Sequence, residues 1–176
     1  MNQSQPLKGA LFMVLAGICF AIANAITYII TSSPDYGGLG FLPQSDTFWQ
    51  YAIETAFSLP LVLRHGLAPL KTKRPVLHVV RVIFSALGVQ AFVMSLAAGT
   101  PIWQVIALVM TAPIFVLVGA RLFLGEVVTP PRWIAAGLGL IGATIVSGLW
   151  TSGLTPAMVY PVAASLLWGA SSLLTK

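Results

Sequence analysis

Charged residues of either sign are scarce in this chain of 176 residues, which has four acidic residues, two histidines and one cysteine. Charged residues make up 7% of the sequence, whereas a soluble globular domain carries about 25%. Hydrophobic residues make up 57%, and the mean hydropathy is +0.92. A chain with so few charged side chains cannot cover a surface that faces water. The composition therefore excludes a soluble domain and indicates an integral membrane protein.

Several chemical classes lack the residues that they need. A single cysteine, Cys19, excludes an intramolecular disulfide and a cysteine-based metal site, and we interpret it as a small core residue. The histidines, His65 and His78, have no companions spaced for a metal site. No Gly-rich phosphate loop ending in Gly-Lys-Ser/Thr is present. We therefore expect no metal, no cofactor, no ATP hydrolysis and no enzymatic activity.

Long apolar segments are what the sequence has instead. We predict membrane-spanning helices at 7–31, 46–63, 77–98, 101–123, 131–149 and 156–175, each close to the range of about 17–25 residues that a spanning helix needs. Four of them begin at or just after a proline, which suits the first turn of a helix. None alternates with a period of two, so a barrel is not expected. The predicted fold class is an all-α membrane bundle of six helices.

The few charges mark the orientation of these helices. Lys8 precedes the first segment, five basic residues between 64 and 81 follow the second, Arg121 and Arg132 flank the connection between the fourth and fifth, and Lys176 closes the sixth. The alternate connections carry no basic residue. This positive-inside pattern predicts a multi-pass protein of the inner membrane whose N-terminus lies in the cytoplasm. Because the net charge of +5 sits at segment ends, it does not indicate nucleic-acid binding.

Glu54 is the strongest candidate for a functional residue. It lies near the middle of the second segment, where a carboxylate costs several kcal/mol unless it is paired, protonated or in contact with water. Asp46, Gln50, Glu54 and Ser58 recur every four residues and share one helix face. Two interpretations remain open for Glu54. One is a proton-coupling or substrate-binding site, and the other is a protonated side chain hydrogen-bonded to a neighbouring helix.

Other polar or aromatic residues lie in the apolar zone and must face protein or water. On the third segment, small and polar residues from Arg81 to Gly99 form a seam suited to close packing or to a cavity wall. Arg81 lies near a segment end, where its side chain can reach the lipid headgroups. We predict a polar cavity lined by the first four helices, with structural hydrogen bonding as the alternative for each residue. The substrate or cavity candidates are Asn24, Tyr28, Gln50, Glu54, Ser85, Gln104, Thr111 and Trp168.

The first and sixth segments resemble each other. Ala16, Phe20 and Ala21 align with Ala164, Trp168 and Gly169. The first segment enters the membrane from the inside and the sixth from the outside. A repeat of five helices must therefore be inverted, which is a recurring plan in secondary transporters.

One stretch carries a family resemblance. Leu124-Gly125-Glu126 at the end of the fourth segment is followed by Pro131-Arg132-Trp133 and a glycine-rich fifth segment, and the stretch from Ser165 to Lys176 in the sixth segment also fits the pattern. This stretch resembles the EamA-type transporters of the drug/metabolite transporter superfamily. The resemblance implies two inverted five-helix repeats, with residues 1–150 as the first repeat and 151–176 as the start of the second. The chain resembles slightly more than half of such a transporter.

The resemblance implies transport of small metabolites, such as amino acids, related compounds or drugs, by alternating access. The expected partners are the lipid bilayer, a small-molecule substrate, and a second half or a second copy of the chain. The alternative is a non-transporting membrane scaffold or an inactive fragment.

Overall fold

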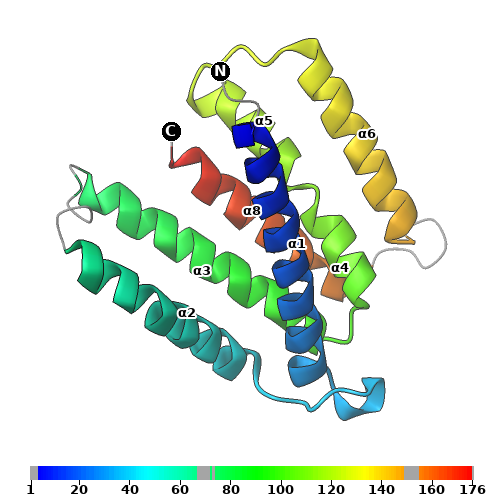
Figure 1. Ribbon diagram of the computed structural model, residues 1–176. Helices are drawn as coiled ribbons and strands as arrows, with labels where there is room; N and C mark the ends of the chain where they lie inside the picture. The colour runs from blue at the N-terminus through cyan, green and yellow to red at the C-terminus, as the bar shows by residue number, and fades with distance from the viewer. Residues whose placement is uncertain (1–3, 67–71, 73, 149–154, 176) are drawn as a thin grey trace.

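The computed structural model describes residues 4–66, 72, 74–148 and 155–175. Short 3-10 turns lie at Pro34–Tyr36 and Pro156–Met158, and the described residues contain no strand. The predicted all-α class is confirmed, and helices occupy all six predicted segments. Figure 1 shows these helices: α1 Ser4–Thr31, α2 Pro43–His65, α3 Pro75–Ala97, α4 Ile102–Val109, α5 Ala112–Phe123, α6 Pro130–Val146 and α8 Val159–Leu173.

Prolines begin these helices as the sequence predicts. Pro75, Pro130 and Pro156 each occupy the first turn of a helix or 3-10 turn, and Pro101 is the N-cap residue of α4. A proline is tolerated there because its missing N–H has no partner within the helix in any case. Pro60, by contrast, lies inside α2, and the helix continues through it to His65.

The fourth predicted segment differs from the prediction, because it is two helices rather than one. The break falls at Met110 and Thr111, just before Pro113. Proline removes one backbone hydrogen bond, and its ring clashes with the carbonyl four residues earlier, here that of Val109. The Thr111 hydroxyl donates to the Leu108 carbonyl at 2.6 Å and so compensates in part for the interrupted helix.

Left-handed glycines end two of the helices. Gly99 follows α3 with φ of +79°, and Gly125 follows α5 with φ of +62°. Residues with a side chain rarely adopt this conformation, which lets the chain turn back on a helix end. The Glu126 N–H then donates to the Ala120 carbonyl at 3.2 Å. The Leu-Gly-Glu sequence noted above is therefore the C-terminal cap of α5.

Helix α8 is the centre of the bundle. It packs against α3, α4 and α5, and it runs antiparallel to α3. In Figure 1, α8 lies behind α1, with α2 and α6 at opposite edges. The hydrophobic core forms where α3, α4 and α8 meet, and its members are Phe92, Val93, Leu96, Val105, Val109 and Ala164.

Small residues allow α8 to approach its neighbours closely. Trp168 lies over Gly88 of α3, where an added Cβ would stand 2.6 Å from the indole nitrogen. A Cβ on Gly119 of α5 would overlap Leu173, and one on Gly169 would stand 3.1 Å from Phe115. Without strong hydrophobic attraction between helices in lipid, such close contact is a main source of stability.

The outer surface is apolar along the length of the helices. Phe12 of α1 is 69% exposed, Phe57 of α2 82% and Phe123 of α5 83%. By length and composition, three of the described helical spans could cross a membrane: Leu7–Thr31, Pro75–Ala97 and Ile102–Phe123. Hydrocarbon is the solvent that such a surface requires.

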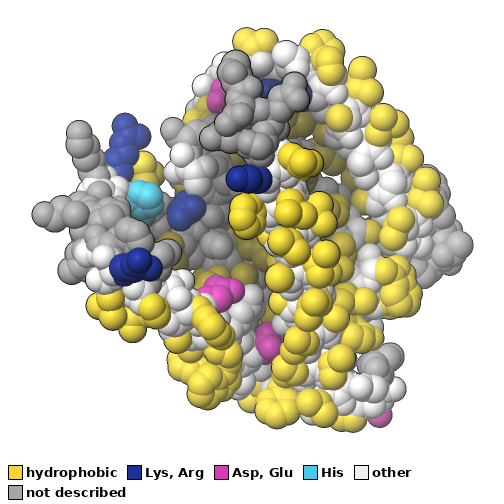
Figure 2. Space-filling view, in the orientation of Figure 1, with side chains coloured by type: hydrophobic (Ala, Val, Ile, Leu, Met, Phe, Trp, Pro, Cys, Tyr) yellow, Lys and Arg dark blue, Asp and Glu magenta, His cyan; other side chains and the backbone are white. Residues whose placement is uncertain are grey.

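One end of the bundle carries the described basic residues, and we call it the basic end. In Figure 2 the Lys and Arg side chains visible on this face lie towards the end at which α1 begins. The start of α1 and the end of α8 lie on that side in Figure 1. The described residues of the basic end are Lys8, Arg64, Arg74, Arg81, Arg121 and Arg132.

The contact at Gly88 predicts a stability difference. In Gly88→Ala the new methyl group must displace Trp168, and overpacking of this kind costs about 1–3 kcal/mol. We expect Tm in detergent to fall by about 3–10 °C. Gly137→Ala on α6 is the matched control, because a Cβ there meets no atom within 4 Å. The control should keep or raise Tm, and equal losses in the two variants would contradict the close packing of α8.

Candidate functional site

The predicted polar stripe on α2 brings Gln50 and Glu54 together. Glu54 lies eleven residues from each end of α2 (54 − 43 and 65 − 54), and its side chain is exposed. Gln50 Nε2 donates to Glu54 Oε1 at 3.4 Å. This bond lies within one helix. The interpretation of Glu54 as a protonated side chain requires a hydrogen-bond partner on a neighbouring helix, and Gln50 is not such a partner. The mid-helix carboxylate thus faces outward from the described residues.

Tyr51 joins this stripe to α3, and the sequence analysis missed it. Its hydroxyl lies near the Ser85 side chain of α3 and interacts with it and with Glu54. Tyr51 lies three residues before Glu54, a spacing that puts both on one side of a helix, so the sequence did contain the signal. A groove of about 520 Å³ runs between α2 and α3 here, and it is lined by Gln44, Thr47, Phe48, Tyr51, Ala52, Thr55, Ala86 and Gln90.

Ser85 also joins α3 to α8. Trp168 Nε1 donates to the Ser85 carbonyl at 3.2 Å. The indole ring lies 5.9 Å from the Phe92 ring, centroid to centroid, at an angle of 36°. Two predicted candidates, Ser85 and Trp168, are therefore in direct contact. Through Ser85, the polar group on α2 is connected to the aromatic side chain at the centre of the bundle.

Thr111 lies at the break between α4 and α5. Its hydroxyl is buried, 3.3 Å from the hydroxyl of Ser165, a residue of α8 with no exposed surface. The Ser165 hydroxyl also donates to the Val162 carbonyl at 2.8 Å. Breaks in spanning helices recur where transporters bind substrates, because they free backbone groups at membrane depth. Thr111 thus lies where the resemblance leads us to expect function, although its hydroxyl already donates to the Leu108 carbonyl.

The cavity lined by the first four predicted helices stays a prediction. The structure describes a cavity of about 640 Å³ between α5, which is the second half of the predicted fourth segment, α6 and α8. Trp168 borders it, as does Arg132 from the first turn of α6. The other lining residues are Met110, Ala112, Pro113, Ile114, Val116, Leu117, Ala135, Ala136, Gly139, Gly169 and Ser172. The sequence analysis assigned no site role to Arg132, because it lies at a segment end among the topology-setting charges.

The remaining candidates lie apart from Glu54. Asn24 is buried on α1, Tyr28 packs against the core cluster, and Gln104 is half-buried on α4. Neither Asn24 nor Gln104 lines the two cavities described above. The structure therefore divides the predicted site into an α2–α3–α8 group and separate polar residues. No cluster of three or more His, Cys, Asp or Glu side chains lies in the described part of the chain.

A bundle of apolar helices with polar groups and cavities inside it defines a polytopic membrane protein of the transporter class. The EamA-like transporter family model matches residues 7–148, and the chain belongs to that family. This confirms the resemblance noted in the sequence and places the chain among transporters rather than enzymes. No solved structure matches the chain significantly.

Curated relatives carry transporter names. A riboflavin transporter of Rhizobium johnstonii is 50% identical over 176 residues, which are 100% of this chain and 56% of the relative. A riboflavin transporter of Vibrio cholerae is 37% identical over 97% of this chain and 56% of the relative. An S-adenosylmethionine uptake transporter of Rickettsia prowazekii is 25% identical over 97% of this chain and 58% of the relative. The chain spans about half the length of these relatives.

These names correct one expectation. The sequence analysis proposed amino acids, related compounds or drugs as substrates, whereas the relatives are named for riboflavin and S-adenosylmethionine. Transport of a small metabolite is supported, and the suggestion of amino acids or drugs is withdrawn. The motif that carried the resemblance caps α5, and a structural cap contains no information about a substrate.

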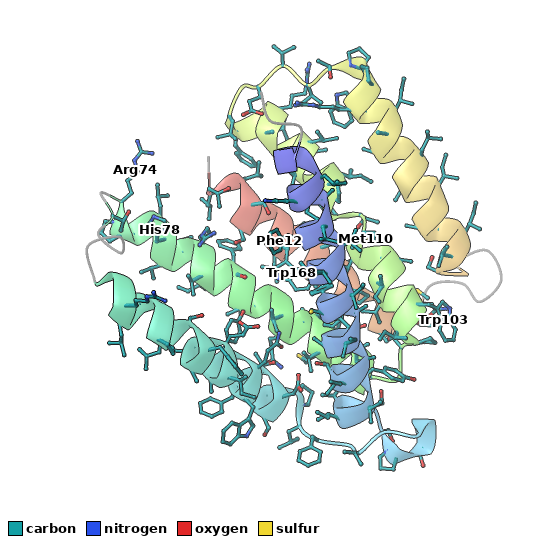
Figure 3. The ribbon with its side chains drawn as sticks, in the orientation of Figure 1. Phe12, Arg74, His78, Trp103, Met110 and Trp168 are labelled. Carbon is teal, nitrogen blue, oxygen red and sulfur yellow. The ribbon has the colours of Figure 1, made fainter. Side chains whose placement is uncertain are left out.

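The indole of Trp168 supplies a test of this arrangement. Trp168→Phe keeps an aromatic ring but removes the donor to the Ser85 carbonyl, and one such bond contributes about 0.5–1.5 kcal/mol. We expect Tm in detergent to fall by about 2–5 °C. Trp103→Phe is the control, because Trp103 is 58% exposed on α4 and lies away from the bundle centre in Figure 3. Equal Tm values for the two variants would argue against the bond.

Proposed function

We propose that this chain forms the first five-helix repeat, and the first helix of an inverted second repeat, of a riboflavin transporter that works by alternating access. The observation that carries the proposal is 50% identity, over the whole chain, to a relative named as a riboflavin transporter. The repeat boundary near residue 150 lies outside the described residues. Transport is proposed for the whole protein, since the chain matches about half of that relative.

The aromatic and polar groups at the bundle centre suit such a substrate. The ring system of riboflavin is planar and uncharged, so it is recognised by stacking and hydrogen bonds rather than by ion pairs. Trp168 borders the 640 Å³ cavity, and that volume lies within the range of about 300–1,000 Å³ typical of small-molecule pockets. We assign Trp168 the role of an aromatic contact for the substrate. Ser85 is assigned as the residue whose carbonyl orients the Trp168 indole.

Orientation follows from the charges. The described basic residues gather at the end of the bundle where α1 begins. Under the positive-inside rule this end faces the cytoplasm, and the protein lies in the inner membrane. The cavity beside Trp168 and the break at Thr111 would then lie between the two membrane surfaces.

The exposed carboxylate of α2 needs a partner other than lipid. Glu54 faces outward at the middle of a helix, where contact with hydrocarbon is costly. Only 6% of the apolar window of α1 is buried. We propose that the second repeat, or a second copy of the chain, covers this side and encloses Glu54 beside a water-filled path. There Glu54 would couple uptake to protons.

Uptake by the whole gene product tests the proposal. Expressed in a bacterium that neither makes nor imports riboflavin, it should restore growth on low riboflavin. Trp168→Leu should lower the initial rate of labelled riboflavin uptake about three- to tenfold, because stacking contributes about 0.5–1.5 kcal/mol. Trp103→Leu is the matched control, and membrane levels of each variant are measured by immunoblot.

Two results would count against riboflavin as the substrate. One is the absence of uptake by a protein that reaches the membrane, which would favour the scaffold or inactive-fragment alternative. The other is uptake of labelled S-adenosylmethionine that excess riboflavin does not inhibit.

A carboxylate exchange tests the coupling role. Glu54→Gln keeps the shape and the hydrogen-bonding reach of the side chain but cannot release a proton. We expect riboflavin uptake by this variant to lose its dependence on external pH between about 5 and 8. Asp35→Asn, in the exposed turn after α1, is the control and should keep that dependence. Unchanged pH dependence in Glu54→Gln would leave Glu54 a structural partner of Gln50.

A further inference from the structure

A second, smaller pocket lies at the basic end, away from the cavity assigned to substrate. It has a volume of about 340 Å³ and lies between the start of α3 and the end of α8. Figure 3 shows Arg74 and His78 at the start of α3, near the end of α8. The lining residues are Arg74, Leu77, His78, Arg81, Leu174 and Thr175.

The charge of this pocket is of one sign. Two arginines line it together with a histidine, and none of its described lining residues carries a carboxylate. In Figure 2 dark blue and cyan side chains gather over the start of α3, with no acidic side chain among them on this face. Two uncompensated arginines in one pocket attract an anion.

Arg81 is held in place through its backbone carbonyl, not through its guanidinium N–H groups. The Ser171 hydroxyl of α8 donates to the Arg81 carbonyl at 3.1 Å, which fixes this turn of α3 against α8. Its Nε is buried and has no hydrogen-bond partner among the described residues. A buried donor without an acceptor is costly, so an acceptor brought by a ligand would be stabilising. The planar guanidinium presents paired donors that match the oxygens of a phosphate.

The first turn of α3 adds to this attraction. Thr72 Oγ1 accepts from the Arg74 N–H at 3.2 Å, but no side chain of the N-cap residue, Arg74, caps the N–H groups of α3 itself. Uncapped N–H groups at the start of a 23-residue helix carry partial positive charge that favours anions. Thr175, from the other wall of the pocket, offers a hydroxyl.

From these observations we propose that the pocket between α3 and α8 binds a phosphate group. Basic pockets between helices at the cytoplasmic surface accept lipid headgroups, and a soluble phosphate presents the same oxygens to Arg81. The bound phosphate bridges the start of α3 and the end of α8, and so stabilises the α3–α8 contact. The proposal does not depend on which substrate the protein carries.

The test measures Tm of the whole gene product in a neutral detergent with two probes. One probe is inorganic phosphate, and the other is short-chain phosphatidylglycerol with phosphatidylcholine as its reference. We expect Tm to rise with at least one probe. A rise with phosphatidylglycerol alone assigns the pocket to a lipid headgroup, a rise with phosphate alone assigns it to a soluble anion, and a rise with both assigns it to the phosphate group itself.

Substitutions locate the effect. In Arg81→Gln the affinity for the active probe should fall about tenfold or more, because charge-assisted hydrogen bonds are lost. Arg121→Gln removes the same charge from an exposed position on α5 and should retain the wild-type response. If Arg81→Gln does not fold, Arg74→Gln, at an exposed position of the same pocket, replaces it as the test variant. The absence of a response to both probes, or equal responses in Arg81→Gln and Arg121→Gln, would overturn the proposal.

Discussion

Close contact between α8 and its neighbours is the constraint on which the rest of the structure depends. In lipid, apolar side chains gain little by leaving the solvent, so helices associate through dense packing and hydrogen bonds. Gly88, Gly119 and Gly169 provide the space for that packing. Trp168 and Ser171 then donate to carbonyls one turn apart on α3. A bulkier residue at Gly88 would displace Trp168 and disturb its bond to the Ser85 carbonyl.

The same contact places the polar groups. Because α8 is fixed against α3, the indole of Trp168 reaches Ser85, and Ser85 in turn meets Tyr51 of α2. Because α8 is also fixed against α5, a cavity remains between these two helices and α6, which packs at the edge. The basic pocket forms where α3 begins and α8 ends. The proposed substrate contact and the proposed phosphate site thus share one helix, at different depths.

Much of the fold could be predicted from the sequence, because hydrocarbon imposes simple rules. Helix positions followed from apolar length, and helix starts followed from proline. The division of the fourth segment was not predicted, although Pro113 contains the signal, because a proline inside an apolar segment is compatible with either a continuous or a broken helix. Pro60 of α2 shows the other outcome. The site was predicted less well, since polar residues on separate helices can be assigned to one cavity only when their packing is known.

The sequence by itself determined the solvent, the helical class, the approximate positions of the helical segments and the family, because each depends on local composition or on a short motif. Only the tertiary structure decided that α8 is central, that Tyr51 joins Glu54 to Ser85, and that the larger cavity lies beside α5, α6 and α8. Those outcomes depend on how closely helices distant in sequence approach each other. The distance between two helices is set by pairs of small and large residues that face each other across an interface. The sequence of one helix shows only one member of each pair.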